Sequence, residues 1–310
     1  MIKYYALDTG VNSLDTVSKI ESGKIIWIDL INSNDEEKDF IEKTFDVELF
    51  TKEEIEEIES SSKYIETENE IGININFIRT DTEMINKEPV SVIIKDKLLV
   101  TQREYNFRAF EDTYKKLEQH RVKDGDDIYL LLLDTRIDYD ADLIEGITEK
   151  ISVINKELHS GKEHRKETLL KIASLQSKII LIRENIVEKQ RILSAMMKSK
   201  MFPKEDYEIM TVMLSDINSI LDHTNFNFER LEYLQNTFLG LVNMEQNRVI
   251  KLFTVLTVIF MPPTLIASMY GMNFKYMPEL SQPWGYPMAI AMMFGSSLIT
   301  LLFFKSRKWI

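Results

Sequence analysis

The chain has 310 residues, of which 44% are hydrophobic and 28% charged, and its formal net charge is −12. Residues 1–250 carry a net charge of −16 and residues 251–310 one of +4. The absence of cysteine excludes disulfides and thiolate metal sites. The first residues lack an apolar run long enough for a signal peptide, so we expect the large acidic part to stay in the cytoplasm. Its charge disfavours nucleic acid and favours cations as partners.

The first 120 residues alternate strand-like and helix-like segments. Apolar runs rich in β-branched residues predict strands, and amphipathic stretches predict helices. In chain order, the predicted segments are a strand over 24–30, helices over 35–45 and 52–60, a strand over 71–79, a hairpin over 90–101 that turns at Lys95-Asp96-Lys97, and a helix over 107–120. We expect an α/β domain with helices packed on a mixed sheet. The sequence has no phosphate loop, nucleophile elbow or dinucleotide fingerprint, so it indicates neither catalysis nor a nucleotide cofactor.

Two long helices are predicted next, over 126–160 and 162–200, as a hairpin of about residues 124–200. The first is rich in Asp and Glu, and the second is rich in Lys and Arg. An antiparallel hairpin would place these opposite charges side by side, although two solvated helix faces account for the same pattern. Pro203 then marks the start of another helix, over 204–221.

The predicted acidic domain covers 1–215, and a stalk helix is predicted over 216–251. Between Ser215 and Lys251 the sequence has no Pro and a single glycine, Gly240. Nine of twelve positions that repeat every 3.5 residues are apolar, as in a coiled-coil seam, and a helix in an ordinary bundle gives a similar pattern. The apolar positions are Ile217, Leu221, Phe228, Leu231, Phe238, Val242, Val249, Leu252 and Leu256.

Two charge-free apolar runs of 19 and 20 residues lie near the end of the chain, over 252–270 and 285–304. Each is long enough to cross a hydrocarbon core of about 30 Å at 1.5 Å per residue. Two buried core helices are the alternative, but runs separated by only 14 residues fit a membrane hairpin better. We predict transmembrane helices at these positions, joined by an extracytoplasmic loop over 271–284 and followed by a basic tail over 305–310.

The charged residues beside the two spans predict their orientation. Arg248 and Lys251 precede the first span, whereas Lys305, Arg307 and Lys308 follow the second. The loop between the spans contains one Lys and one Glu. The positive-inside rule then places both termini in the cytoplasm, which makes the chain a multi-pass protein of the cell (inner) membrane.

The first span carries polar residues that a simple membrane anchor does not need. They continue a line from the predicted stalk with spacings of three and four residues, so they share one stripe of a helix. We interpret this stripe as the lining of a polar path, because lipid does not favour it. The alternative is that the hydroxyls bond to their own helix carbonyls. The stripe consists of Asn243, Asn247, Ile250, Thr254, Thr257, Met261, Thr264 and Ser268. Two helices cannot enclose a pore, so this interpretation requires an oligomer.

Directly after the first span comes Gly271-Met272-Asn273, followed by the letters MPEL at 277–280 and WGYP at 284–287. This arrangement resembles the CorA family of magnesium transporters. The signature of that family is Gly-Met-Asn at the outer end of the first of two C-terminal membrane helices. The resemblance is specific over 240–310 and only architectural over 1–239.

The resemblance implies a funnel-shaped homopentamer with the first span of each subunit around a central pore. Gly271, Met272 and Asn273 would form the selectivity filter for Mg²⁺, and Glu279 in the loop would attract cations. The pore positions of the family correspond here to Asn247, Ile250, Phe253, Thr257, Met261, Thr264 and Ser268. The residues of the basic ring would be Lys305, Arg307 and Lys308.

The same resemblance implies that Mg²⁺ bound between the acidic domains keeps the pore closed. Domains of large negative charge repel one another, and bridging cations would relieve that repulsion. Asp216 and Asp222, on the helix before the stalk, are the candidate ligands. Mg²⁺ is therefore expected both as the transported ion, driven by the membrane potential, and as the regulator.

Two other functions stay open at this point. The same pore would serve cobalt or nickel transport or zinc efflux, although it lacks the Cys and paired His ligands that softer metals prefer. A membrane-anchored acidic scaffold or sensor is the alternative of another class. The polar stripe and the Gly-Met-Asn motif argue against it, because an anchor requires neither.

Overall fold

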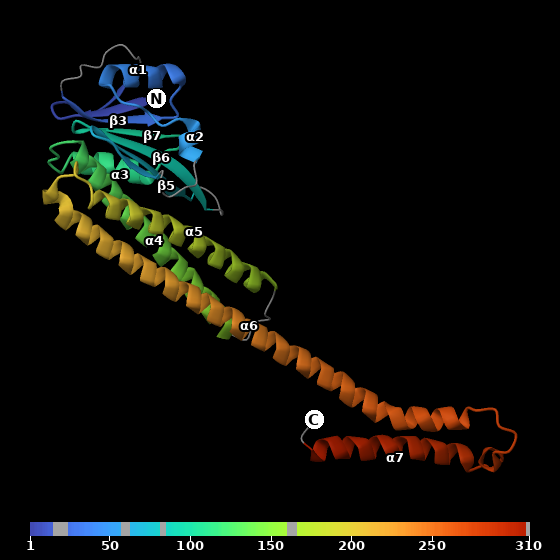
Figure 1. Cartoon of the computed structure of the whole chain (residues 1–310). Helices are drawn as coiled ribbons and strands as arrows, with labels where there is room; N and C mark the ends of the chain where they lie inside the picture. Colours follow the sequence, from blue (N-terminus) through green and yellow to red (C-terminus); the bar gives the residue numbers. More distant parts are fainter. Residues whose placement is uncertain (15–23, 57–62, 81–84, 160–165, 308–310) are drawn as a thin grey trace. The chain divides into compact units, whose positions relative to one another are not determined.

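A computed structural model describes five segments of the chain (Figure 1): residues 1–14, 24–56, 63–80, 85–159 and 166–307. The chain divides into two compact units, Met1–Gln235 and Asn236–Ile310. The first unit contains a sheet with helices around it, and the second contains apolar helical segments.

The described part of the first unit forms one sheet of seven strands in the order β2-β1-β3-β7-β6-β5-β4. β3 and β7 run parallel and the other neighbouring pairs run antiparallel, so the sheet is mixed, as predicted. The strands are β1 (Ile2–Ala6), β2 (Gly10–Leu14), β3 (Ile25–Ile31), β4 (Tyr64–Glu66), β5 (Glu70–Arg79), β6 (Asn86–Lys95) and β7 (Leu98–Arg103). β1, β2 and β4 lie toward the two edges of the sheet and are not among the strands predicted from the sequence.

Local signals fix two elements where they were predicted. α1 (Asp35–Phe45) starts with a capping box, in which Asn34 Oδ1 accepts the N–H of Glu37 at 2.8 Å and Glu37 Oε2 accepts the N–H of Asn34 at 3.1 Å. β6 and β7 are joined by Asp96 and Lys97, whose φ angles of 48° and 70° are both left-handed. This is the geometry of a two-residue hairpin turn that matches the twist of the strands.

Helices cover both faces of the sheet (Figure 1). α1 and α2 (Lys52–Glu56) lie over one face, where Leu30, Ile41 and Val100 belong to a buried apolar core. α3 (Arg108–Leu117) lies over the other face, where Trp27 stacks on Tyr114 with ring centroids 4.4 Å apart. α2 ends at Glu56, and the rest of the helix predicted over 52–60 lies outside the described residues.

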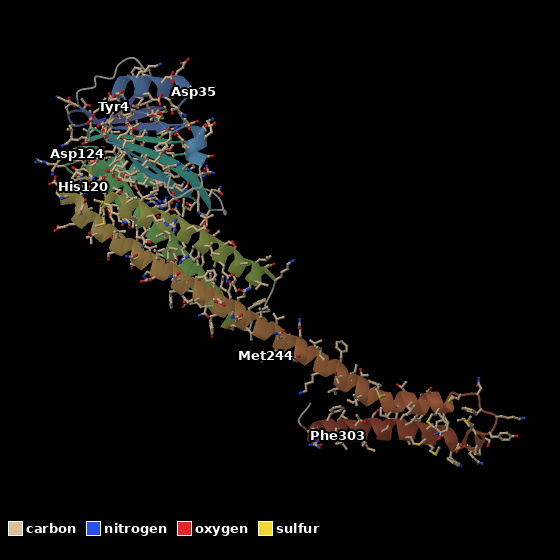
Figure 2. The ribbon with its side chains drawn as sticks, in the orientation of Figure 1. Tyr4, Asp35, His120, Asp124, Met244 and Phe303 are labelled. Carbon is tan, nitrogen blue, oxygen red and sulfur yellow. The ribbon has the colours of Figure 1, made fainter. Side chains whose placement is uncertain are left out.

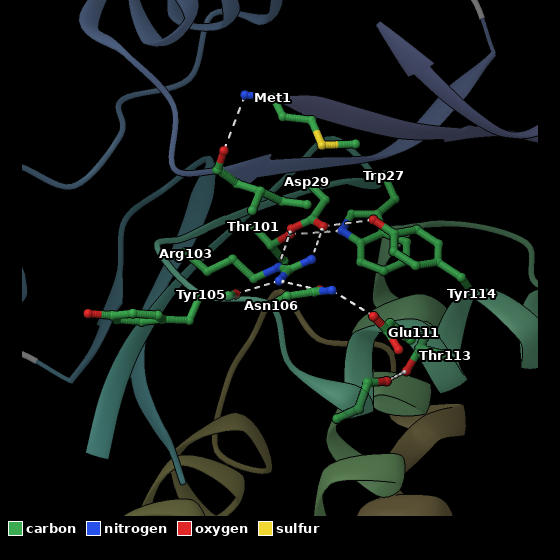
Figure 3. A network of polar contacts seen from close by, with 12 residues as sticks. Met1, Trp27, Asp29, Thr101, Arg103, Tyr105, Asn106, Glu111, Thr113 and Tyr114 are labelled. Carbon is green, nitrogen blue, oxygen red and sulfur yellow. Dashed lines mark hydrogen bonds and ion pairs between the residues drawn. The ribbon is translucent and has the colours of Figure 1, made fainter. Parts of the chain in front are cut away.

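A buried polar network joins β3 and β7 to α3 (Figure 3). The carboxylate of Asp29 accepts hydrogen bonds from Arg103 Nη2, Thr101 Oγ1 and Tyr114 OH, each at 2.8 Å. Trp27 Nε1 donates to Thr101 Oγ1 at 3.0 Å. Asp29 and Arg103 are both fully buried, and such a charge pair is tolerated only when its remaining polar atoms are bonded. The network therefore fixes the register of the parallel pair of strands.

α4 (Gly125–His159) and α5 (Lys166–Met196) form the predicted helical hairpin, although α5 ends four residues earlier than predicted. Opposite charges do meet across it, as the antiparallel arrangement predicts. Lys171 Nζ lies 3.8 Å from Glu157 at the surface, and Lys189 Nζ lies 3.0 Å from buried Asp140. Burial lowers the pKa of Lys189 to about 8, and the charge of Asp140 opposes that shift.

α6 (Tyr207–Tyr270) is a single helix of 64 residues, preceded by the 3₁₀ turn η1 (Lys204–Asp206). It contains most of the helix predicted over 204–221, together with the stalk and the first span. The prediction that the apolar seam of the stalk forms a coiled coil is wrong for the part of the seam that lies in the first unit. Within the first unit, Ile217 and Leu231 are buried in the same chain rather than presented to another stalk. The bundle interpretation is therefore the right one for this segment.

Hydrogen bonds confirm that this part of α6 packs on the helical hairpin. Asn227 Nδ2 donates to Thr148 Oγ1 of α4 at 2.7 Å, and Gln176 Nε2 of α5 donates to Gln235 Oε1 at 3.3 Å. Thr224 and Asn227 are buried beside the apolar seam.

The second unit consists of the C-terminal part of α6, the 3₁₀ turn η2 (Pro278–Ser281) and α7 (Gly285–Ser306). α6 ends and α7 begins where the two spans were predicted to end and begin, and α7 continues two residues past Phe304. Val255 of α6 and Ala289 of α7 are among the few buried residues of this unit.

Candidate ion pathway and filter

Two helical segments of the described chain are long and apolar enough to cross a membrane, Lys204–Tyr270 and Gly285–Ser306. Only 6% and 11% of their most apolar stretches are buried. A core helix of a soluble protein would be mostly buried, so the alternative of two buried core helices does not fit these segments. Their exposed side chains are chemically suited to lipid or to a partner helix.

The polar stripe lies on a side of α6 that α7 does not cover. Every residue of the stripe is exposed, and Ile250, Phe253 and Met261 are 61%, 66% and 60% exposed. The side of α6 that meets α7 carries Val255 and Ile259, which lie roughly opposite the stripe at 3.6 residues per turn. The exposed positions named by the resemblance are Asn247, Ile250, Phe253, Thr257, Met261, Thr264 and Ser268.

The threonine hydroxyls of the stripe bond to their own helix, as the alternative interpretation expects. Thr254 donates to the carbonyl oxygen of Ile250 at 2.9 Å, and Thr257 and Thr264 donate to the carbonyls four residues before them at 2.9 and 2.8 Å. This bond occupies the hydroxyl proton and leaves the oxygen lone pairs available. A line of such oxygens can accept hydrogen bonds from the water molecules around a cation, which donate their O–H groups outward. The two interpretations are therefore compatible.

The proline pair in α6 leaves two carbonyls without their usual helical donors. Pro262 and Pro263 have no N–H, so the carbonyls of Val258 and Ile259 lose the bonds that a continuous helix would provide. Ser297 Oγ of α7 donates to the carbonyl oxygen of Ile259 at 3.4 Å. A side chain of the second span thus compensates for a break in the first, as unsatisfied backbone groups in lipid require.

The motif Gly271-Met272-Asn273 lies immediately after the last residue of α6. Gly271 N–H donates to the carbonyl oxygen of Ala267 at 2.9 Å, and a Cβ at Gly271 would lie 3.1 Å from that oxygen. A side chain at Gly271 would thus be crowded by a backbone oxygen, whereas the φ angle of Gly271 is not left-handed. Met272 is 48% exposed and Asn273 is also exposed. The amide of Asn273 is available to a ligand at the end of the exposed stripe.

The loop between the spans is folded back on the start of α7. η2 contains the half-buried Glu279, whose carbonyl oxygen would collide with a Cβ at Gly285. Gly285 N–H donates to the carbonyl oxygen of Gln282 at 3.0 Å. The position of Glu279 in the loop is thus set by close backbone packing on the first residue of α7.

The basic tail is only partly described. Lys305 and Arg307 are exposed at the end of α7, and the guanidinium of Arg307 lies 5.9 Å from the ring centroid of Phe303. Lys308 lies outside the described residues.

The candidate regulatory residues are exposed but do not come together within the chain. Asp216 and Asp222 lie six residues apart on α6, so their side chains point to different sides of the helix. No group of three or more His, Cys, Asp or Glu side chains that could hold a metal ion occurs in the described part of the chain.

A group of carboxylates that was not predicted from the sequence lies where α4 and α6 begin. Asp124, labelled in Figure 2, accepts the N–H of Asp127 at 3.3 Å and caps α4. Burial, with the nearby charges of Asp124 and Asp206, raises the pKa of Asp126 to about 6. The charge run at 124–127 is visible in the sequence, but its approach to Asp206 comes only from the tertiary fold.

Comparisons with known proteins agree with this arrangement. The family model described as CorA-like Mg²⁺ transporter protein matches residues 22–306. A magnesium transport protein CorA from Wolinella succinogenes is 33% identical over the full length of both chains, and one from Salmonella typhimurium is 36% identical over 92% of each. The solved CorA magnesium transporter from Methanocaldococcus jannaschii shares the fold, with a TM-score of 0.85 and 20% identity over 100% of this chain and 98% of that one. The chain belongs to the CorA family.

Proposed function

We propose that this chain assembles into an oligomer, a pentamer in the form the family resemblance implies, that conducts Mg²⁺ through a central pore lined by α6. The observation that carries the proposal is the exposed stripe of α6, which lies away from α7 and leads to Gly271-Met272-Asn273. The curated relatives are magnesium transport proteins, which supports the choice of ion.

The proposed filter suits a strongly hydrated cation. Mg²⁺ gives up its waters reluctantly and prefers octahedral oxygen ligation. A ring of exposed Asn273 amides, one from each subunit, accepts hydrogen bonds from the hydrated ion without the tight binding that a carboxylate ring would give. The half-buried Glu279 in the loop adds a negative charge that attracts cations toward the ring.

Below the filter, the stripe and the neighbouring Phe253 supply both polar and apolar levels. The lone pairs of Thr257 and Thr264 accept hydrogen bonds from the hydrated ion. The large apolar side chains of Ile250, Phe253 and Met261 form constrictions that close by excluding water.

The proposed orientation places both termini in the cytoplasm of the cell, with the loop over 271–284 outside the inner membrane. Exposed Lys305 and Arg307 beside the second span support it through the positive-inside rule. The membrane potential then drives uptake, with roughly 2.3 kcal/mol per charge per 100 mV and so about twice that for a divalent ion.

We also propose that cytoplasmic Mg²⁺ bound between the acidic domains closes the pore. Asp216 and Asp222 are exposed on different sides of α6, which supports ligation shared between neighbouring subunits rather than within one chain. Loss of the bridging ions would leave the negative domains to repel one another and open the ring.

A flux measurement tests the pore. The full-length protein is reconstituted in liposomes with a magnesium-sensitive dye, and a negative-inside potential is imposed. Each amide ligand is worth about 0.5–1.5 kcal/mol, so loss of the ring in Asn273→Ala is expected to lower Mg²⁺ flux roughly tenfold or more. Gln282→Ala, an exposed amide in the same loop, is the matched control and should conduct normally. Absence of flux in the wild type, or full flux in Asn273→Ala, would refute the proposal.

The same vesicles separate the remaining alternatives. Co²⁺, Ni²⁺ and Zn²⁺ flux, measured under the same potential, distinguishes a magnesium pore from one for softer metals, and a scaffold or sensor would conduct none of them. Millimolar Mg²⁺ on the cytoplasmic side should reduce flux in the wild type and less so in Asp216→Asn and Asp222→Asn. Equal inhibition in all three proteins would count against regulation at these carboxylates.

A further inference from the structure

A small pocket of about 130 Å³ lies in the first unit, on the face of the sheet that α1 and α2 cover. Asn32 and Ser33, directly after β3, form part of its wall, and Glu104, directly after β7, forms another part. Lys38 of α1 and Lys52 of α2 also line it. The pocket therefore lies at the carboxyl ends of the two parallel strands.

These strand ends are a topological switch point. β3 leads into α1 on one face of the sheet, whereas β7 leads into α3 on the other face (Figure 1). The N–H of Asn32 donates to the carbonyl oxygen of Arg103 at 2.8 Å, which holds the two strand ends together. In open α/β sheets, a crevice at the carboxyl ends of adjacent strands with diverging connections is a common ligand-binding position.

Two polar atoms in the pocket wall lack protein partners. Ser91 of β6 and Gln102 of β7 are paired across the strands, so their side chains stand next to each other on the same face. Ser91 Oγ and Gln102 Oε1 are both buried, and no group in the described segments hydrogen-bonds to either. A buried polar atom without a partner costs about 1–3 kcal/mol, so these atoms call for a polar occupant.

The charge of the wall favours an anion. Lys38 and Lys52 line the pocket and form no ion pair with any described residue, so both charges are available to an occupant. Glu104 is the acidic side chain of the lining, and two lysines outweigh it. The pocket is thus locally cationic on a strongly acidic protein.

We propose that this pocket binds a phosphate group, either free hydrogen phosphate or the phosphate of a small metabolite. Lys38 and Lys52 would pair with the anionic oxygens, and Ser91 Oγ would donate to one of them. The P–OH proton of hydrogen phosphate would be donated to Gln102 Oε1. A phosphate monoester makes the same bond only as its monoanion, which still carries one P–OH proton. The site is independent of the pore, because its residues lie in the sheet domain.

Calorimetric titration of the full-length protein in detergent micelles, without Mg²⁺, tests this proposal. Inorganic phosphate and a nucleoside monophosphate are titrated separately to distinguish the free anion from a metabolite phosphate. Saturable binding of one phosphate per chain is expected for at least one of them. Lys38→Gln and Lys52→Gln should each weaken that binding roughly tenfold, because each removes a charge-assisted hydrogen bond. Lys43→Gln removes the same charge from the exposed part of α1 outside the pocket and should bind normally.

Ser91→Ala gives a second readout that does not depend on a charge change. It removes the unpartnered hydroxyl, so the variant should retain its fold and lose most of the rise in melting temperature that phosphate produces in the wild type. The proposal would be overturned if neither ligand bound. It would also be overturned if Lys38→Gln, Lys52→Gln and Ser91→Ala left the binding unchanged. Either result would assign the pocket to water. Loss of phosphate binding with normal Mg²⁺ flux would leave the pore proposal intact.

Discussion

Asp126, in the first turn of α4, is a carboxyl group whose environment opposes its charge. It is half-buried, and burial together with the charges of Asp124 and Asp206 raises its pKa to about 6. In the unfolded chain an Asp has a pKa of about 3.9. The folded state therefore binds the proton more tightly, and this contribution to stability is lost as pH rises from about 4 to about 6.

Asp126→Asn should stabilise the protein at neutral pH. The variant removes the cost of ionising Asp126, which we expect to be about 1–2 kcal/mol above pH 6 after allowance for partial exposure, and close to zero at pH 4. Thermal unfolding of the full-length protein across this pH range measures the effect. Asp112→Asn is the control of opposite sign, because the hydrogen bond from Lys115 lowers the pKa of Asp112. An Asp126→Asn variant no more stable than wild type at pH 7 would contradict the pKa argument.

At the scale of elements, α4 begins in contact with the β6–β7 turn. Gly125 N–H donates to the carbonyl oxygen of Lys97 at 2.7 Å. A Cβ at Gly125 would lie 2.8 Å from that oxygen and 2.5 Å from the backbone nitrogen of Leu99. These neighbours are backbone atoms, which cannot rotate away, so the contact requires glycine.

Gly125→Ala should therefore displace the start of α4 and destabilise the first unit by about 1–3 kcal/mol, as other overpacked sites do. Gly146→Ala, in the same helix, is the matched control, because nothing lies within 4 Å of its Cβ position. It should stabilise the helix by roughly 0.5–1 kcal/mol, since alanine has the higher helix propensity. Chemical denaturation of both variants measures the difference. Equal effects of the two substitutions would refute the proposed contact.

At the scale of the whole molecule, the first unit leaves large apolar side chains of α6 exposed. Val212, Phe226 and Tyr233 are 61%, 57% and 64% exposed, and their spacing is a multiple of seven residues. Such a stripe is unusual on a monomer and indicates an interface. It lies apart from the seam at Ile217 and Leu231 that packs on α4 and α5, so the same helix has a second, exposed face on which the proposed oligomer could form.

Phe226→Glu should weaken the proposed oligomer. Arg230 lies beside position 226, so the new carboxylate can be paired, but it replaces the apolar contact area of Phe226 with a charge that must lose its water at an interface. Light scattering of the detergent-solubilised protein should therefore report a smaller assembly. Asn225→Glu places the same charge on the neighbouring exposed residue and should have the smaller effect. An unchanged mass for Phe226→Glu would show that this face of α6 does not contribute to the assembly.

The sequence determined the features that depend on local chemistry. The amphipathic stretch over 35–45 predicts α1, and the uncharged runs that end at Tyr270 and begin at Gly285 predict the two spans. The stripe through Thr257 and Thr264 follows from helical spacing alone. Each of these signals lies within one segment, so no knowledge of distant contacts was needed.

Only the tertiary structure decided which faces meet. The apolar seam at Ile217 and Leu231 has the spacing of a coiled coil, but its partners are α4 and α5 of the same chain. The pairing of Ser91 with Gln102, and the parallel contact of β3 with β7, join residues far apart in the sequence. Periodicity tells which side of an element is buried, whereas its partner depends on long-range packing, which a single segment does not encode.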